Sequence, residues 1–405
     1  MQKVYIAGAK RTPIGSFLGG LKDVSASDLG KTAIEAVLSQ SGINPSEVNE
    51  VSLGNVLSAG QGQGVARQAS IKAGIPETTP AYSTNMVCGS GLKTVMNAFT
   101  GIRAEEYDVV VAGGTESMSQ APYLLPGRTR DGIKMGNFQT IDHMVHDGLT
   151  DAFEGYHMGI TAENIAEQYE ISREDQDAFA YDSQQRALTA LDEGIFDDEV
   201  VPVSWTSRRK QEITVDTDEY PNRNANLEKM QSLRPAFKKD GTVTAANASG
   251  LNDGASATVI VGEEYLTQYD IQPLAEIVAI GQGGVDPSIM GMGPVPAVKQ
   301  ALKKSGLSFE DIDLLELNEA FASQSLAVIQ ELSEAFEVDK EVLKQKTNLH
   351  GGAIALGHPI GASGNRILVT LLYTLKRKGL KYGIASLCIG GGMGAAVIIR
   401  NTDVD

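Results

Sequence analysis

Short apolar runs alternate with longer segments of helical periodicity along this chain, and this alternation constrains its fold more than any other feature. The runs 4–7, 51–56 and 108–112 predict strands, and residues 26–40 carry apolar side chains at helical spacing. Strand–helix alternation is typical of layered α/β folds. Because the run 109–112 is apolar without interruption, we expect a sheet that is covered on both faces.

The same alternation returns in the C-terminal part. Residues 314–317, 383–387 and 395–399 predict strands. A helix between the first two of them is apolar around most of its circumference, at Ile367, Leu368, Leu371, Leu372 and Leu375. A helix of that kind is expected to be buried.

Two short strings occur in the same order in both parts. Cys88-Gly-Ser-Gly and Val111-Ala-Gly-Gly in the first part resemble Gly361-Ala-Ser-Gly and Cys388-Ile-Gly-Gly in the second. Glycine-rich turns after strands are common, so coincidence is the alternative. Because both strings keep their order, we infer an internal duplication of one α/β unit.

Composition excludes several classes of protein. The 405 residues carry 34 Lys and Arg against 51 Asp and Glu, a net charge of −17, so we expect no binding of nucleic acid. Two cysteines are too few for a disulfide scaffold or for a zinc site of their own. No signal peptide or membrane-spanning run is recognised, and we expect a cytoplasmic protein.

The charge is distributed unevenly. Residues 141–200 hold 16 acidic and two basic side chains, which we interpret as a solvated surface. Residues 203–239 hold eight basic and five acidic side chains. A basic segment inside so acidic a chain is a candidate for contact with an anionic ligand. This change of character separates the two α/β parts.

Cys88 is the first candidate for chemistry. It directly precedes a predicted helix, whose free amides and dipole stabilise a thiolate and lower the pKa of the thiol. The glycines that follow it permit a tight turn that exposes the sulfur. On this ground alone, a nucleophile and a buried structural cysteine are both open.

His358 and Cys388 lie in glycine-dense segments. His358 precedes the buried C-terminal helix and is either a general base for a thiol or a histidine that holds its turn by hydrogen bonds. Cys388 follows a predicted strand and opens a glycine-rich turn whose amides can face an oxyanion. A dinucleotide-binding loop is excluded there, because residues 395–399 continue as a strand.

Two polar residues are weaker candidates. Asn318 comes just after the strand 314–317, where it positions water or substrate, or caps a helix. Ser249 lies in Asn247-Ala-Ser-Gly, where a turn residue is an equally good interpretation.

Taken together, these strings resemble the thiolase family over nearly the whole chain. The similar segments, in order, are 85–93, 113–119, 156–159, 247–254, 318–321, 351–364 and 388–394. Within the family the chain most resembles biosynthetic acetyl-CoA acetyltransferases, with Gly155-Tyr-His-Met-Gly and Met290 as supporting features.

The resemblance implies a five-layered α/β fold of two similar halves with an inserted loop domain. The N-terminal thiolase domain is expected over residues 1–118 and 247–270, the inserted domain over 119–246, and the C-terminal thiolase domain over 271–405. The insertion would bind coenzyme A. Residues 128–144 would supply the contacts of a homotetramer built as a dimer of dimers.

The resemblance also implies a ping-pong Claisen condensation of two acetyl-CoA molecules to acetoacetyl-CoA and CoA. Cys88 would attack the first thioester while His358 takes its proton, and Cys388 would remove a proton from the second acetyl-CoA. His358 and a water held by Asn318 would form one oxyanion hole, and the amides of Cys88 and Gly390 the other. No metal and no cofactor are implied.

Further positions match residues along the coenzyme A path of the family: Leu149, His157, Met158, Ser249, Met290 and Phe321. Family members often place an arginine against the adenine, two residues after the position of Tyr220. This chain has Asn222 there, and the neighbouring Arg223 becomes the candidate for the nucleotide contact.

Three alternatives stand beside this interpretation. The closest is a degradative 3-ketoacyl-CoA thiolase of broader chain length, which runs the same chemistry toward cleavage. A ketosynthase would need two histidines where this chain has one histidine and Cys388. A non-catalytic CoA-binding relative is disfavoured, because all four catalytic positions are filled.

Overall fold

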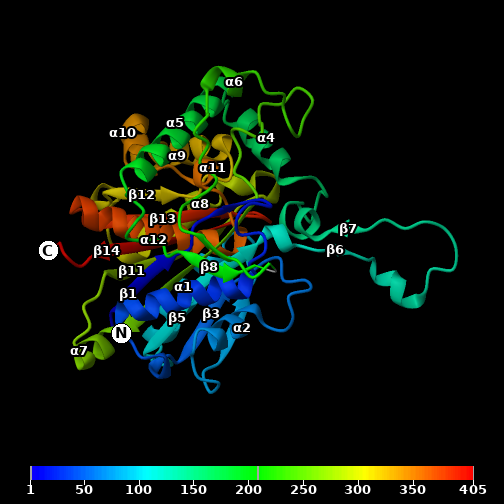
Figure 1. The fold of residues 1–405 in the computed structure, drawn as a ribbon. Coiled ribbons are helices and arrows are strands. Elements are labelled where there is room, and N and C mark those ends of the chain that lie inside the picture. Colours follow the sequence, from blue (N-terminus) through cyan, green and yellow to red (C-terminus); the bar gives the residue numbers. More distant parts are fainter. Residues whose placement is uncertain (1, 208, 405) are drawn as a thin grey trace.

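The computed structural model describes residues 2–207 and 209–404, which are built around one ten-stranded sheet (Figure 1). The strands follow the order β12-β13-β14-β11-β1-β10-β5-β3-β4, and the short β2 (Gly15–Ser16) pairs with β10. In that order they span Leu314–Leu317, Tyr382–Ile389, Met393–Asn401, Ala275–Gly284, Val4–Arg11, Asn252–Gly262, Val109–Ser117, Glu50–Gly54 and Ala81–Thr84.

The sheet repeats one topology twice. In the first half, β5 pairs parallel with β3 and antiparallel with β10, which pairs antiparallel with β1. In the second half, β13 pairs parallel with β12 and antiparallel with β14, which pairs antiparallel with β11. The halves are joined where β1 and β11 pair over three residues. The duplication that two short strings predict is therefore confirmed by the strand order.

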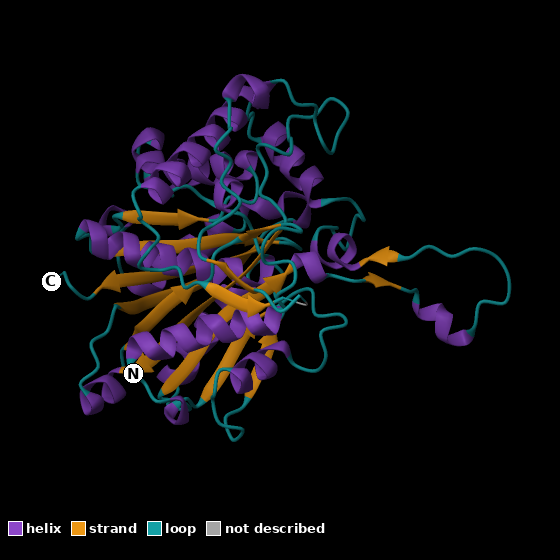
Figure 2. Cartoon of the chain, viewed as in Figure 1, coloured by secondary structure: helices purple, strands orange, loops and turns teal. Residues whose placement is uncertain are grey.

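Helices complete the five layers, with sheet and helices alternating through the body (Figure 2). The outer layers are α1 (Ala26–Ser41) and α2 (Val65–Lys72) on the first half, and α8 (Pro294–Ser305) and α9 (Ala322–Phe336) on the second. Between the halves lie α3 (Ser90–Arg103) and α12 (Ile360–Lys378), which share one apolar core with strands from both.

Side-chain alternation along β5 shows how one strand serves two layers. Val109 and Val111 pack in the core beneath α1, whereas Val110 and Ala112 pack against α3 and α12. Successive strand residues point to opposite faces, so an uninterrupted apolar run suits a sheet that is covered on both sides. The predicted two-sided burial is confirmed.

Between β5 and β10 the chain leaves the sheet. It forms α4 (Met158–Gln168), α5 (Arg173–Asp192), α6 (Leu227–Gln231) and two hairpins, β6–β7 (Tyr123–Leu124, Ile141–Asp142) and β8–β9 (Val203–Thr206, Glu212–Val215). The Ser172 side chain accepts a hydrogen bond from the amide of Asp175 and caps the N-terminus of α5. Buried Arg11 of β1 ties this segment to the sheet through ion pairs with Glu199 and Asp218.

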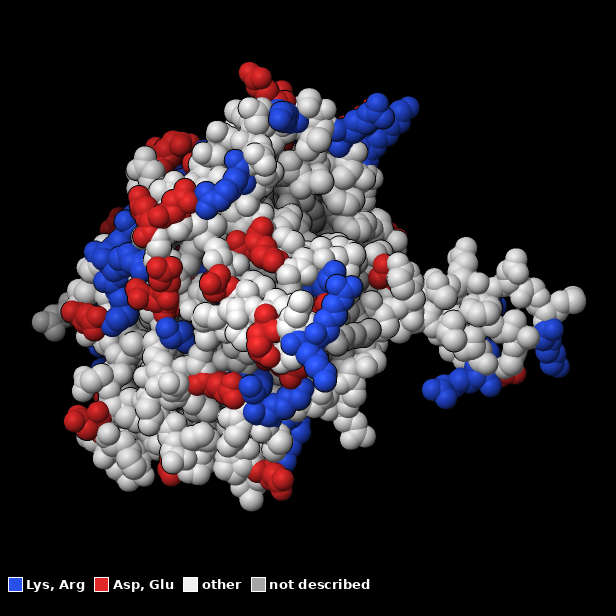
Figure 3. All heavy atoms as spheres, in the orientation of Figure 1, with Lys and Arg blue, Asp and Glu red and all other residues white. Residues whose placement is uncertain are grey.

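The β6–β7 hairpin projects from the body as an arm, residues 123–142 (Figure 1). On the face in Figure 3, acidic and basic side chains mix over the body, and the arm carries mainly basic ones. The remaining helices are α7 (Glu263–Tyr269), α10 (Lys340–Gln345) and α11 (Ala353–Leu356). None of the helices in the described ranges is long and apolar enough to cross a bilayer.

Candidate active site

Cys88 lies in a tight turn between β4 and α3. Val87 before it has a φ of +46°, and the Ser90 hydroxyl accepts a hydrogen bond from the Met86 amide at 2.8 Å while donating to the Val87 carbonyl at 2.6 Å. Gly89 is required because a Cβ there would overlap the side chain of Ile389 in β13. The turn therefore places the sulfur at the N-terminus of α3 and against the second half of the molecule.

His358 is held by hydrogen bonds in a buried turn before α12. Its backbone amide donates to Oδ1 of Asn252 at 2.9 Å, and its Nδ1 lies 2.6 Å from the hydroxyl of Ser363. Its Nε2 is buried and meets no hydrogen-bonding group of the described residues. Burial, helped by the charge of Arg366, lowers the pKa of His358 to about 3. The imidazole is therefore neutral at pH 7 and able to accept a proton.

Cys388 lies inside β13, which corrects its predicted place after the strand. The strand continues to Ile389 because Cys388 still pairs with Gly394 of β14. Its side chain is buried against Met158, Met290 and Phe321. Burial raises the pKa of the Cys388 thiol, and a negative charge on Cys88 raises it further.

The turn after β13 reaches the other cysteine. The backbone amides of Gly390 and of Cys88 itself face the sulfur of Cys88 and lower the pKa of its thiol. Two amides that converge on one sulfur can also face the oxygen of a carbonyl carbon bonded to that sulfur. This pair is the one that the family resemblance implies as an oxyanion hole.

Asn318 follows β12, as the sequence predicts. Its backbone amide donates to the Ser386 carbonyl of β13 at 3.0 Å. Both polar atoms of its side chain are buried and unpaired within the described residues. An unpaired buried amide costs roughly 1–3 kcal/mol, so its retention points to a polar ligand group at this position.

Nine of the predicted residues line one cavity of about 570 Å³: Cys88, Leu149, His157, Met158, Ser249, Met290, Phe321, His358 and Gly390. Backbone hydrogen bonds bring distant segments to its wall, because the amide of Met158 donates to the Leu149 carbonyl at 2.8 Å and that of Ser249 to the Ala320 carbonyl at 2.9 Å. Asn318 and Cys388 do not line this cavity, but Cys388 packs directly behind three residues that do.

The predicted low pKa of Cys88 is wrong. Burial raises the pKa of this thiol to about 11, although the amides of Gly390 and Cys88 lower it. The cavity wall is largely apolar, and Val87, Met118 and Ile360 lie beside the turn that carries the Cys88 sulfur. The free-energy cost of removing a thiolate from water outweighs the stabilisation that the backbone dipoles give it here. The resting site therefore holds a neutral thiol and a neutral imidazole.

Arg223 lies apart from the other predicted residues. It lines a neighbouring cavity of about 820 Å³, where it forms an exposed ion pair with Asp192 at 2.8 Å. The two cavities adjoin each other, because Ser16, Tyr220 and Ala245 line both. Together they form a recess with a deep apolar part around Cys88 and a polar mouth around Arg223.

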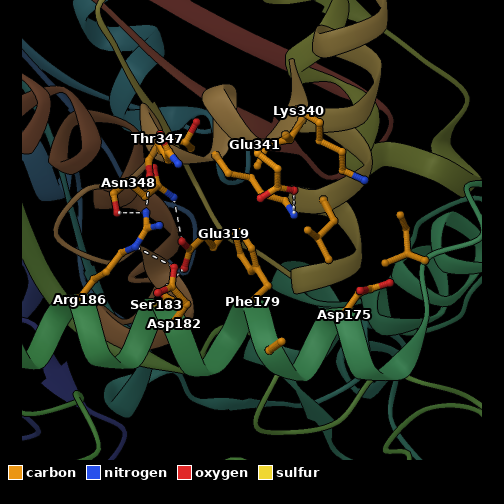
Figure 4. Close-up of a pocket in the computed structure, with 16 residues that line it drawn as sticks. Asp175, Phe179, Asp182, Ser183, Arg186, Glu319, Lys340, Glu341, Thr347 and Asn348 are labelled. Carbon is orange, nitrogen blue, oxygen red and sulfur yellow. Dashed lines mark hydrogen bonds and ion pairs between the residues drawn. The ribbon is translucent and has the colours of Figure 1, made fainter. Parts of the chain in front are cut away.

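A further cavity, of about 320 Å³, lies between α5, α9 and α10 (Figure 4). At its inner end the buried Glu319 accepts hydrogen bonds from the Ser183 hydroxyl at 2.7 Å and the Asn348 side-chain amide at 2.8 Å. Asn348 also bonds both backbone groups of Leu317. This network fixes the segment that carries Asn318, and none of the predicted site residues lines the cavity.

Sequence reasoning missed several residues of the catalytic cavity, of which Phe237 is the clearest. Its ring stacks on His157 with centroids 4.6 Å apart and an interplanar angle of 19°. It also lines the cavity beside Phe321. Phe237 lies in an irregular basic segment with no apolar period, so only the fold reveals it.

Comparisons with known proteins agree with this architecture. The family description "Thiolase, N-terminal domain" matches residues 4–264, and "Thiolase, C-terminal domain" matches residues 271–401. A "Probable acetyl-CoA acyltransferase" of Staphylococcus aureus (strain COL) is 54% identical over 399 residues, 98% of this chain and 99% of the relative. An "Acetyl-CoA acetyltransferase" of Chromobacterium violaceum is 53% identical over 98% of this chain and 99% of its own length.

Solved structures also match over nearly the whole length of the chain. The crystal structure of the Bacillus anthracis acetyl-CoA acetyltransferase matches with a TM-score of 0.94 at 44% identity, over 99% of both chains. An acetyl-CoA acetyltransferase from Syntrophomonas wolfei matches with a TM-score of 0.95 at 43% identity, over 99% of this chain and 100% of the other.

The duplicated five-layered body and these similarities define an acyl-transferring enzyme. The chain belongs to the thiolase family.

Proposed function

We propose that this enzyme is an acetyl-CoA C-acetyltransferase, which condenses two acetyl-CoA molecules to acetoacetyl-CoA and CoA and catalyses the reverse thiolysis. The observation that carries the proposal is the convergence of Cys88, His358 and the Gly390 amide on one apolar cavity, with Cys388 packed behind it. The names of the similar bacterial proteins support the acetyl-CoA substrate.

In the first half-reaction, the sulfur of Cys88 attacks the thioester carbonyl of acetyl-CoA. His358 takes the thiol proton at Nε2, because the thiol and the imidazole are both neutral at rest. As negative charge develops on the carbonyl oxygen, the backbone amides of Cys88 and Gly390 would stabilise it. The C–S bond to CoA breaks, Cys388 protonates the leaving thiolate, and the acetyl group stays on Cys88.

In the second half-reaction, the Cys388 thiolate removes a proton from the methyl carbon of a second acetyl-CoA. Burial raises the pKa of Cys388, so its thiolate is a strong base suited to a weak carbon acid. His358 and a water held by the Asn318 side chain would donate hydrogen bonds to the enolate oxygen, and both side chains have buried polar atoms that no described residue pairs. The carbanion attacks acetyl-Cys88, and the released sulfur regains its proton from His358.

The shape of the recess suits coenzyme A. The deep apolar part would take the acetyl group and pantetheine along Leu149, His157, Met158, Ser249 and Phe321. The polar mouth, with Arg223 and Lys229, would take the nucleotide and its phosphates. We further propose that the enzyme is cytoplasmic and works as a homotetramer.

Mass spectrometry of the protein after incubation with acetyl-CoA tests the nucleophile. We expect one acetyl group on Cys88, no adduct in Cys88→Ser, and in Cys388→Ala an adduct that still forms, although more slowly because the leaving thiolate has lost its proton donor, but no condensation. An adduct elsewhere, or none, contradicts the role of Cys88. Equal loss of both steps in Cys388→Ala contradicts the division of labour between the cysteines.

A degradative 3-ketoacyl-CoA thiolase is the alternative. Met290 and Phe321 are buried at the cavity wall next to Cys388 and shorten the space for an acyl chain, which favours the short substrate. Thiolysis of 3-ketoacyl-CoAs of increasing length decides between the two. Activity should be highest on acetoacetyl-CoA, and a maximum at longer chains would establish the alternative.

A further inference from the structure

Ser363 makes the only side-chain hydrogen bond that the described residues offer to the ring of His358. Ser363 lies in the first turn of α12, is fully buried, and places its Oγ 2.6 Å from Nδ1 of His358. The same hydroxyl lies 3.0 Å from the carbonyl oxygen of Pro359, one helical turn back. Ser363 therefore contacts one group that only accepts and one ring nitrogen that can donate or accept.

The hydroxyl has a single proton, which it can donate to only one of these two contacts. When Ser363 donates to the Pro359 carbonyl, its oxygen must accept at Nδ1, so Nδ1 carries a proton. A neutral imidazole protonated at Nδ1 has its lone pair on Nε2. That Nε2 is buried, has no hydrogen-bond partner among the residues that the structure describes, and belongs to a ring that lines the cavity of Cys88.

We propose that Ser363 is a positioning residue that holds His358 in the Nδ1-protonated tautomer and thereby aims a proton-accepting Nε2 at the thiol of Cys88. The inference rests on the proposed role of His358 as the base for Cys88. The opposite tautomer carries its proton on Nε2 and cannot take another from the thiol.

The arrangement serves both protonation states of the ring. In the neutral and in the protonated imidazole, Nδ1 donates to Ser363, so the hydroxyl does not turn when His358 receives the proton. A second contact fixes the backbone, because the His358 amide donates to Asn252, whose own side chain donates to the Gly15 carbonyl at 3.0 Å. Groups that need no reorientation during proton transfer lower its barrier.

The local sequence explains the placement. Pro359 is the N-cap of α12, and residues four apart share one face of a helix, so Ser363 lies directly above the Pro359 carbonyl. His358, one residue before the cap, folds its ring over the same turn. Burial of Ser363 excludes water from competing for Nδ1.

Single-turnover acetylation of Cys88 tests the proposal. Ser363→Ala should slow the acetylation step about 10- to 100-fold, the range that loss of an orienting partner of an imidazole produces elsewhere. The acetyl-CoA concentration for half-maximal rate should stay within about twofold, because Ser363 does not line the cavity. Ser363→Thr, which keeps the hydroxyl, should restore most of the rate.

Two matched variants separate this role from packing. Thr374→Ala removes a buried hydroxyl that donates to the backbone carbonyl four residues earlier in α12, at 2.8 Å, as the hydroxyl of Ser363 does. Among the described residues this hydroxyl bonds no histidine, so Cys88 should be acetylated at the normal rate in this variant. Ser363→Val has the shape of Ser363→Thr without the hydroxyl and should be as slow as Ser363→Ala.

Unchanged acetylation in folded Ser363→Ala, or equal rates in the Thr and Val variants, would overturn the proposal. If Ser363→Ala does not fold, the Thr and Val pair decides alone. If Cys88 of the unmodified enzyme is acetylated, the proposed function holds whatever the Ser363 variants show. If it is not acetylated, the proposed function itself is refuted.

Discussion

Cys88 experiences two opposing influences, and the weaker one is visible in the sequence. The N-terminus of α3 and the Gly390 amide stabilise a thiolate, but the apolar cavity around the sulfur destabilises it more. The net effect raises the pKa of the thiol to about 11. In the proposed mechanism, His358 would therefore remove the proton during attack, because the thiol is not ionised beforehand.

Alkylation of Cys88 by iodoacetamide should therefore depend steeply on pH in the free enzyme. With a pKa near 11, about one thiol in a thousand is ionised at pH 8, and the rate should rise roughly tenfold per pH unit from pH 7 to 9.5. His358 stays neutral over this range, so the slope of the rate against pH reflects only the ionisation of the Cys88 thiol. Peptide mapping by mass spectrometry gives the rate at Cys88 itself.

The same chain unfolded in urea is the matched control. There the alkylation rate should level off above about pH 9, because an exposed cysteine has a pKa near 8.5. A plateau between pH 7 and 8 in the folded enzyme would instead indicate a stabilised thiolate and contradict the effect of burial.

At the scale of elements, the crossing of α3 and α12 depends on glycine. A Cβ on Gly91 of α3 would lie 2.9 Å from the Gly361 carbonyl, and one on Gly364 of α12 would overlap the backbone of Leu92. These two glycines end the two copies of one repeated string, Cys88-Gly-Ser-Gly and Gly361-Ala-Ser-Gly. The repeated Ser-Gly is thus explained by two equivalent helices whose backbones touch at a central crossing.

Gly364→Ala should separate the two helices, because neither backbone can yield without moving a sheet. We expect a loss of about 1–3 kcal/mol in the free energy of unfolding, measured with urea, from overpacking. Acetylation of Cys88 should also slow, because Cys88 and His358 precede these two helices.

Gly101→Ala is the comparison within α3. Its Cβ would meet only the side chain of Tyr107 and no backbone, and alanine favours a helix. This variant should lose less stability than Gly364→Ala and should keep its acetylation rate. Equal effects of the two substitutions would show that backbone contact at the crossing is not the cause.

At the scale of the whole molecule, the arm of residues 123–142 exposes apolar side chains. Met135 is 95% exposed, Tyr123 69% and Leu125 59%. An arm that projects into water with its apolar groups uncovered is typical of a surface that contacts another chain. This agrees with the expectation of a homotetramer, in which arms of different subunits would cover one another.

Replacing residues 126–138 with a short Gly-Ser linker should convert tetramers to dimers in analytical ultracentrifugation. The full chain is measured in parallel, and Gly127→Ala, which has open space around its Cβ, is the control within the arm. Tetramers that persist without the arm, or a full chain that sediments as a monomer, would refute its role.

Much of the fold follows from local pattern. The strand 314–317 and the helix that begins at Ala26 lie where the sequence pattern predicts them. The strands β10 and β11 are not among the predicted strands, although Thr258-Val-Ile-Val in β10 is a β-branched run of the kind that predicts one. The sequence predicts the end of this strand before Cys388, because a glycine-rich turn begins two residues later, whereas β13 continues to Ile389.

The candidate site divides in the same way. The residue types in their glycine-rich turns, and through them the family, are determined by the sequence alone, because turns and helix starts depend on neighbouring residues. Only the tertiary structure decides that Cys88 is a neutral thiol, that Arg223 lies outside the catalytic cavity and that Ser363 contacts His358. Burial and hydrogen bonding at Cys88 come from both halves and from the segment between β5 and β10, so no local pattern contains them.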